Sequence, residues 1–155
     1  MRISLADWLF EVDVEATDRY TTRCTEDHCL CAYCRNYYEM VDREYPAIRP
    51  FLERFGVNLL GPSELMPFEP TLFMACYRVV GQIIRKGVQR MHVYGIPIRP
   101  EEADEKTFFL WIGEMELPWV QDEPEVEVVS PANEPEFMQR MLNKWLETRQ
   151  TDEYS

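Results

Sequence analysis

Four of the five cysteines of this chain lie within eleven residues, at Cys24, Cys29, Cys31 and Cys34. Their spacing is C-x4-C-x-C-x2-C, and thiolates are the ligands that zinc prefers in structural sites. Cys31 and Cys34 form the C-x-x-C turn that commonly supplies two zinc ligands at the start of a helix. A helix N-terminus also favours the thiolate that a metal requires. The spacing therefore predicts a zinc site with these four cysteines as ligands and His28 as a substitute ligand.

Three other interpretations of the cysteines stay open. Zinc modules commonly separate two ligand pairs by a dozen or more residues, so the compact cluster also fits reduced thiols that pack as small apolar side chains. Iron–sulfur ligation is a further alternative, although the spacing matches neither common ferredoxin pattern. Cys31 and Cys34 also fit a thiol redox site, but they do not follow a strand as in thioredoxin-like folds. Cys76 lies in an apolar run and is expected to pack in the core.

Outside the cysteines, the sequence contains no assembled catalytic motif. His92 lies in an apolar strand pattern and is expected to be a packing residue. The six glycines are isolated and form no phosphate-binding loop, and acidic pairs are too abundant to identify a catalyst. Trp111, Trp119 and Tyr94 would suit a small-molecule pocket, but aromatic residues in strands usually belong to the core.

These observations favour a non-enzymatic binding or adaptor domain with a structural zinc site. We name no catalytic residue for it. The alternative is a thiol-dependent redox protein or cysteine enzyme that uses Cys31 and Cys34.

The negative charge of the chain is confined to one segment. The net charge of the 155 residues is −12. Residues 101–136 carry 12 acids and only Lys106, a net charge of −11, whereas residues 1–100 carry 13 acids and 12 bases. The negative electrostatic potential of residues 101–136 repels phosphates, so we expect no nucleic-acid partner. It permits a protein partner whose basic surface faces residues 101–136, and it leaves the oligomeric state open.

The N-terminal residues predict neither a signal peptide nor a membrane anchor. Asp7 and Glu11 interrupt the only apolar stretch near the start, and no later run reaches the roughly 18 apolar residues of a membrane helix. We therefore expect a cytoplasmic protein without membrane contact. Thiols stay reduced in that compartment, where clustered cysteines more often bind metal than form disulfides.

The length suits one domain, and the pattern predicts an α+β domain over residues 1–150 with a frayed tail at 151–155. Alternating apolar residues predict a strand at 7–15, and the polar run 16–23 is expected to be a loop that leads into the cysteine-rich loop 24–34. Helical spacing then predicts helices at about 30–45 and 47–55, which form a helical hairpin over 30–56.

The second half of the chain predicts an antiparallel sheet of about four to five strands. Residues 57–70 are expected to be an irregular connection. Strands are predicted at 72–84, with a bend, at 91–98 and at 107–115, with the acidic loop 99–106 between the last two, giving a meander over 72–115.

The C-terminal residues predict a last helix. A short strand is expected at 126–129, and Asn133 can cap a helix over 133–149 that packs on the sheet. Its apolar stripe consists of Phe137, Met138, Met141, Leu142, Trp145 and Leu146.

The signature C-x-C-x-x-C-R-N at residues 29–36, together with Phe51–Val57 and Leu117–Val120, resembles a family of small bacterial domains. The resemblance covers about half of the chain and implies an α+β domain of bacterial origin. It implies no activity.

Overall fold

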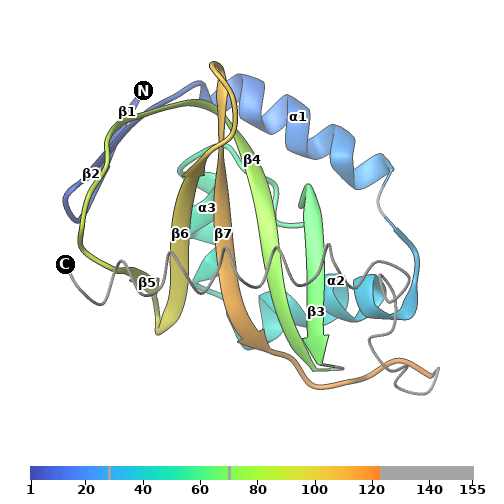
Figure 1. The fold of residues 1–155 in the computed structure, drawn as a ribbon. Helices are drawn as coiled ribbons and strands as arrows, with labels where there is room; N and C mark the ends of the chain where they lie inside the picture. Colours follow the sequence, from blue (N-terminus) through green and yellow to red (C-terminus); the bar gives the residue numbers. More distant parts are fainter. Residues whose placement is uncertain (28, 70, 123–155) are drawn as a thin grey trace.

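The computed structural model describes residues 1–27, 29–69 and 71–122 (Figure 1). Within these ranges the chain forms an α+β fold with a seven-stranded antiparallel sheet and three helices. The elements in chain order are β1 (Arg2–Leu5), β2 (Trp8–Val12), α1 (Val14–Glu26), α2 (Ala32–Glu44), α3 (Ile48–Glu53), β3 (Glu64–Glu69), β4 (Leu72–Arg85), β5 (Met91–Val93), β6 (Ile96–Glu102) and β7 (Thr107–Glu116).

The 14-residue strand β4 is the element to which most of the sheet is attached. Its first part pairs with β3 on one side and β7 on the other, and its last part pairs with β2. The sheet order is β1-β2-β4-β7-β6-β5. Strand β3 lies outside this order and pairs with the first part of β4. Figure 1 shows β4 turning away from β3 and β7 to run beside β2. Gly81 lies at this change of partner with φ +152, and a Cβ there would come within 2.1 Å of the Glu11 carbonyl oxygen, so only glycine fits.

The helices and one face of the sheet enclose the main core. In Figure 1, α2 and α3 are seen behind the strands, on the far side of the sheet. Alternate residues of β4 and β7 point to this side, because successive side chains of a strand face opposite ways. The fully buried residues that join the two layers include Tyr37, Val41, Leu52, Phe55, Phe73, Tyr77, Phe108 and Leu110.

The other face of the sheet carries a separate apolar cluster. It consists of Met66, Met74, Cys76 and Trp111, with Phe109 packed against it. All five come from β3, β4 and β7, so both faces of the central strands are apolar.

Buried threonines attach α1 to the sheet and to the segment before β3. Asp13 caps the helix, since its side chain accepts a hydrogen bond from the Ala16 N–H at 3.0 Å. The Thr17 hydroxyl accepts from the Val80 N–H of β4 at 2.9 Å. One turn later, the Thr21 hydroxyl accepts from the Asn58 N–H at 2.9 Å. The helix thus contacts the rest of the domain through polar as well as apolar side chains.

The fold confirms the α+β class and the antiparallel sheet, and it gives more strands than expected. The predicted helices at 30–45 and 47–55 correspond to α2 and α3, and the bent strand at 72–84 corresponds to β4. The strand expected at 107–115 corresponds to β7.

Of three local predictions for the first 70 residues, one had the wrong bounds and two were wrong. The strand expected at 7–15 is present as β2, but it covers only Trp8–Val12, and β1 precedes it. The loop expected at 16–23 is the middle of α1, because Thr17 and Thr21 face inward at helical spacing. The irregular connection expected at 57–70 contains β3, which pairs with β4 despite Pro67 because it lies at the sheet edge.

The meander expected over 72–115 also differs in strand order. The strand expected at 91–98 is divided into β5 and β6 by the turn at Tyr94 and Gly95, and β6 extends into the expected loop 99–106. Strand β7 then lies between β4 and β6, so β4 does not pair with the next strand in sequence.

The predicted strand 126–129, helix 133–149 and tail 151–155 lie outside the described residues. None of the helices within 1–27, 29–69 and 71–122 has the length and apolar content needed to cross a membrane.

The polar contact between α1 and β4 gives a stability prediction. We expect Thr17→Val to lower the free energy of unfolding by about 1–3 kcal/mol, because it leaves the Val80 N–H buried without an acceptor. Urea unfolding measures this loss. Thr22→Val is the matched control on the same helix, since Thr22 is exposed, and it is expected to change the free energy by less than about 0.5 kcal/mol. Equal losses in both variants would contradict the role given to Thr17.

Candidate metal centre

The loop between α1 and α2 and the first turn of α2 position three cysteines. Cys31 is the N-cap of α2, with extended backbone at ψ 163, and its carbonyl accepts the Arg35 N–H at 2.9 Å. Cys34 lies three residues later in the first turn, on the same side of the helix as the cap. Cys29 belongs to the loop that precedes the cap. The start of α2 therefore determines where all three side chains lie.

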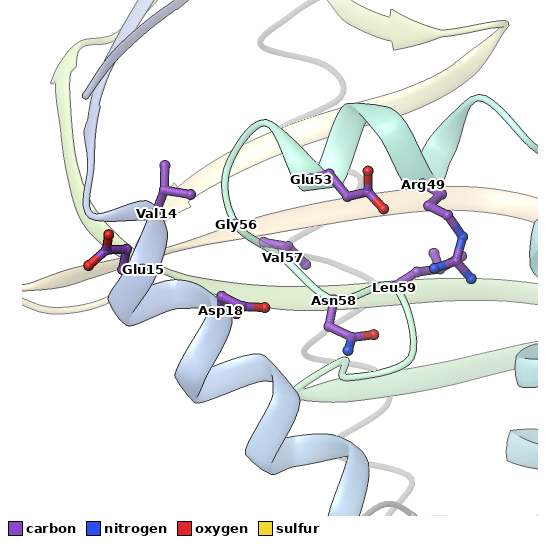
Figure 2. Close-up of a pocket in the computed structure, with 9 residues that line it drawn as sticks. All are labelled: Val14, Glu15, Asp18, Arg49, Glu53, Gly56, Val57, Asn58 and Leu59. Atoms are coloured by element: carbon purple, nitrogen blue, oxygen red, sulfur yellow. The ribbon is translucent and has the colours of Figure 1, made fainter.

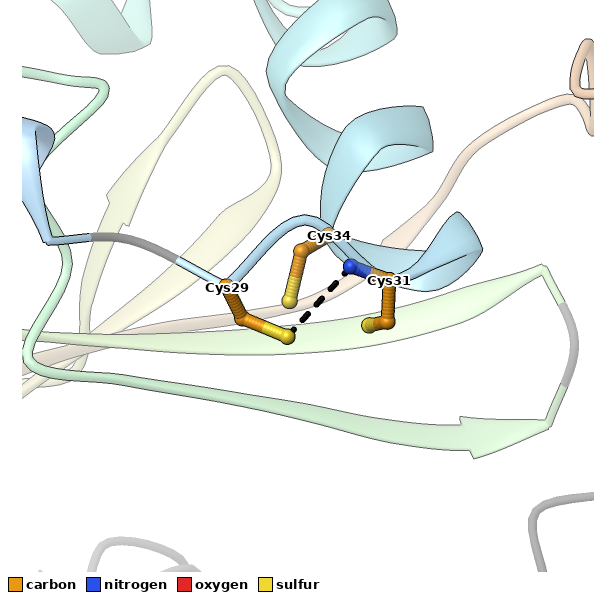
Figure 3. A group of neighbouring side chains, drawn as sticks. All are labelled: Cys29, Cys31 and Cys34. Atoms are coloured by element: carbon orange, nitrogen blue, oxygen red, sulfur yellow. Dashed lines mark hydrogen bonds between the residues drawn. The ribbon is translucent and has the colours of Figure 1, made fainter.

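The three sulfur atoms converge. Those of Cys29, Cys31 and Cys34 all lie within 4.8 Å of one another. Figure 3 shows the three side chains gathered beside the first turn of α2. The Cys31 N–H donates to the Cys29 sulfur at 3.4 Å, which turns the loop residue back toward the helix. Cys29 and Cys31 are exposed and Cys34 is half-buried, so the group opens to solvent on one side.

Arg35 ties this loop to the chain that follows β7. Its guanidinium donates to the Leu30 carbonyl oxygen at 2.6 Å and to the Gln121 side chain at 3.4 Å. The neighbouring Asn36 is buried, donates to the Pro118 carbonyl at 3.0 Å and accepts from the Val120 N–H at 2.9 Å. These hydrogen bonds hold the start of α2 against the segment 117–121, and that contact fixes the orientation of the cysteine-bearing turn.

The surroundings shift the pKa values of the Cys29 and Cys34 thiols in opposite directions. The Cys31 N–H, and then the Cys31 side chain, lower the pKa of the Cys29 thiol by hydrogen bonding to its thiolate. Burial raises the pKa of the Cys34 thiol well above its usual range, and the neighbouring thiols raise it further. Burial also raises the pKa of Tyr38, one turn beyond Cys34, with the three thiols adding to the effect. Several thiolates this close together repel one another, and a divalent cation removes that repulsion.

The distances and donor type fit zinc. Ligands at about 2.3 Å from a tetrahedral zinc lie about 3.8 Å from one another. The three sulfurs are already within 4.8 Å, so a contraction of about an ångström would bring them to ligand spacing. Soft thiolates favour zinc or Cu(I) over magnesium or calcium, which prefer oxygen ligands. Cys29, Cys31 and Cys34 are therefore the residues that would hold a metal ion.

The structure places the other predicted ligands differently. Cys24 lies in the last turn of α1, is half-buried and does not belong to the group of converging sulfurs. His28, the predicted substitute ligand, lies outside the described residues. Cys76 is buried on the second face of the sheet and takes no part in the group.

The aromatic residues considered for a small-molecule pocket do not come together. Trp111 belongs to the second apolar cluster, and Trp119 packs on Tyr33 with ring centroids 5.4 Å apart. Tyr94 is 88% exposed at the turn between β5 and β6. These positions give no common binding surface.

A hollow that sequence reasoning missed lies between α1, α3 and the loop after α3. Its volume is about 340 Å³, and Figure 2 shows Glu15 and Asp18 from α1 across from Arg49 and Glu53 of α3. Arg49 also pairs with Asp42 at 3.2 Å. Charges of both signs line this hollow, so it has no clear complementarity to one class of ligand.

Comparison with known protein families, with curated proteins and with solved structures gives no match for this chain. The site is therefore interpreted from its geometry alone.

The opposite pKa shifts of the Cys29 and Cys34 thiols predict which of the two reacts faster. In metal-free protein near pH 7.5, Cys29 is expected to react with iodoacetamide at least about tenfold faster than Cys34, because more of it is thiolate and it is exposed. Fragmentation of the tryptic peptide that holds both residues locates the label over time. Equal rates would show that the hydrogen bond from the Cys31 N–H does not persist in solution.

Proposed function

We propose that this chain is a non-enzymatic binding domain in which a structural zinc ion holds the loop between α1 and α2. The observation that carries the proposal is the convergence of the sulfurs of Cys29, Cys31 and Cys34 to within 4.8 Å of one another. Thiolate ligands near a helix start are typical of structural zinc sites, whereas catalytic sites keep an open position for water or substrate.

The position of the site supports a structural role. The loop joins two helices of the same domain, and its described polar contacts include the hydrogen bonds to the Cys29 sulfur and to the Leu30 carbonyl oxygen. A zinc ion at this place would link the loop to the first turn of α2. In doing so it would add rigidity where the chain has little apolar burial, since Cys29, Leu30 and Cys31 are all exposed.

Cys24 is the fourth ligand that we propose. It lies five residues before Cys29, at the end of α1, where fraying of the last turn would let its thiol approach the other three. His28 is the alternative fourth ligand, because it is adjacent to Cys29 in sequence.

A protein with a basic surface is the partner that we propose. The end of β6 carries Glu101 and Glu102, and the turn from β6 to β7 carries Asp104, Glu105 and Lys106; three of these four acids are exposed. Arg78 pairs with Asp104 at 3.2 Å and Lys86 with Glu102 at 3.8 Å, so the four acids still outnumber Arg78, Lys86 and Lys106 by one. Charge complementarity at such a surface raises the association rate and the specificity of binding more than it raises the affinity.

Metal content tests the zinc site directly. Protein purified without a metal-affinity tag is expected to contain about one zinc per chain, and Cys29→Ser, Cys31→Ser or Cys34→Ser to contain less than about a tenth of an equivalent, because thiolate ligands are lost. Cys76→Ala is the matched control and should keep its zinc, since Cys76 lies away from the site. Metal-free wild-type protein with unchanged thermal stability after zinc addition would contradict the proposal.

The fourth ligand is tested by cobalt substitution. In Co(II)-loaded protein, Cys24→Ser is expected to weaken the thiolate-to-cobalt charge-transfer absorption while leaving three thiolate ligands, and His28→Ala is expected to leave the spectrum unchanged. The reverse pattern would assign the fourth position to His28.

A thiol redox role is the second candidate, because exposed Cys29 and Cys31 lie beside half-buried Cys34 at distances from which a disulfide is within reach. A peroxide would take two electrons from two thiols, forming one disulfide and releasing water. Intact-mass analysis of metal-free protein after one equivalent of hydrogen peroxide is expected to show a loss of about 2 Da if this role is correct. The same treatment of zinc-loaded protein is the control, since bound thiolates should be protected. Stable thiols in both samples would exclude the redox role.

A further inference from the structure

Among the described residues, the large apolar side chains that are exposed gather in two places, apart from the terminal Met1. They are Leu30 and Val120 beside the start of α2, and Ile84, Val88 and Tyr94 at the end of β4 and around β5. Single exposed apolar side chains are normal on a folded domain, whereas groups of them mark contact surfaces. Both places are therefore candidate contact surfaces.

The first group lies at the loop between α1 and α2. Leu30 is 67% exposed and Val120 is 44% exposed. The Arg35 guanidinium donates to the Leu30 carbonyl oxygen and to the Gln121 side chain, so it joins the loop to the residue that follows Val120. The two apolar side chains are thus presented by one hydrogen-bonded unit.

Exposed carboxylates flank this unit. Glu26 and Asp27 lie at the end of α1, just before the loop. Glu39 of α2 accepts a hydrogen bond from the Gln121 side chain at 2.9 Å, and Asp122 is the next residue. We define the loop surface as Leu30, Val120, Glu26, Asp27, Glu39 and Asp122.

The second group lies along the end of β4 and on either side of β5. Ile84 is 46% exposed, Val88 is 56% exposed and Tyr94 is 88% exposed. Residues 82–98 contain three bases and no acid, and all three bases are exposed. We define the strand surface as Ile84, Val88, Tyr94, Arg85, Lys86 and Arg90.

Asp7 orders the loop that belongs to the strand surface. Its carboxylate accepts the Val88 N–H at 2.8 Å and the Gln89 N–H at 3.1 Å. The Trp8 indole N–H donates to the Gln89 carbonyl oxygen at 3.3 Å. A loop that is already ordered loses little conformational entropy when it binds. The strand surface is therefore preformed.

The two surfaces have charges of opposite sign. Arg23 and Arg35 lie beside the four acids of the loop surface, which leaves more acids than bases there. Asp7 and Glu102 lie beside the three bases of the strand surface, and Glu102 pairs with one of them at 3.8 Å, which leaves more bases than acids. Apolar centres with opposite charges around them are complementary to each other.

The two surfaces lie on opposite sides of the domain. Figure 1 shows the loop between α1 and α2 on the right of the view, and β5 with the end of β4 on the left. A contact between the two surfaces cannot form within one chain. It can form between two chains.

We propose that the strand surface of one copy of this chain binds the loop surface of a second copy. Because two different surfaces on opposite sides take part, the contact is heterologous and adds copies head to tail. The proposal goes beyond the proposed function and does not use the zinc ion, since the Arg35 hydrogen bonds join the Leu30 backbone to Gln121.

Sedimentation velocity of the wild-type chain is the first test. An interface with few apolar side chains is weak, so the weight-average sedimentation coefficient is expected to rise between about 10 µM and about 1 mM protein. Raising the salt from about 0.1 M to about 1 M is expected to remove at least about half of this rise, because ions screen exposed charges.

Charge reversal on each surface is the second test. Lys86→Glu/Arg90→Glu reverses the strand surface, and Glu26→Lys/Asp27→Lys reverses the loop surface. Each variant alone is expected to remain monomeric, because one of its two surfaces no longer binds. Their equimolar mixture is expected to form a dimer of twice the 18.5 kDa chain mass and nothing larger, since each variant keeps one intact surface.

A matched control separates the two surfaces from net charge. Arg19→Glu/Arg43→Glu makes the same change in net charge as Lys86→Glu/Arg90→Glu, at exposed positions outside both surfaces. It is expected to assemble as the wild-type chain does. Equal loss of assembly in these two variants would overturn the proposal.

Other results would also overturn it. A wild-type sedimentation coefficient that stays constant up to about 1 mM would leave both surfaces to a different protein. Assembly that stops at a wild-type dimer would indicate a symmetric interface, and assembly unchanged by salt would exclude the charges. Monomeric wild-type protein that co-sediments with phosphatidylserine vesicles would assign the strand surface to a bilayer. These wild-type measurements decide the matter if a variant does not fold.

Discussion

The hydrogen bonds of β4 are the constraint on which the rest of this fold depends. One strand pairs with β3 and β7 over its first part and with β2 over its last part, so the N-terminal hairpin and the C-terminal strands share a single backbone. The change of partner occurs at Gly81, where the Glu11 carbonyl oxygen leaves no space for a Cβ. A side chain there would separate β2 from β4 and displace α1, which follows β2 directly.

The position of the cysteines follows from this arrangement. The Thr17 hydroxyl fixes α1 to β4, and the buried Asn36 fixes the start of α2 to the chain after β7. The first helix is thereby held to the sheet and the second to the segment that follows β7, and the connection between the helices is only a few residues long. Cap geometry then brings Cys31 and Cys34 to one side, and the hydrogen bond to the Cys29 sulfur completes the group. The convergence of the sulfurs thus depends on tertiary contacts as well as on local spacing.

Local patterns predicted the parts of the structure that local physics determines. The helical spacing before Pro46 predicted α2, and the C-x-x-C spacing predicted the pair at its start. The pattern failed for α1, because the residues that α1 buries are Thr17 and Thr21, whose hydroxyls serve as acceptors for backbone N–H groups. A hydropathy pattern counts threonine as polar and so predicts a loop. The strand order could not be predicted from local patterns either, because the position of β7 between β4 and β6 depends on contacts between residues distant in sequence.

The composition of β4 matches the burial of both faces of this strand. The run from Leu72 to Tyr77 is continuously apolar, which made it ambiguous between helix and strand in the sequence. An antiparallel strand that has solvent on one side alternates apolar and polar residues, whereas this run is buried on both sides. Phe73, Ala75 and Tyr77 are covered by the helices of the first face. Met74 and Cys76 are equally buried on the other, and no described helix contributes to their cluster. A continuous apolar run in an antiparallel strand is therefore a sign that both faces of the strand are buried, as they are for residues 73–77 in β4.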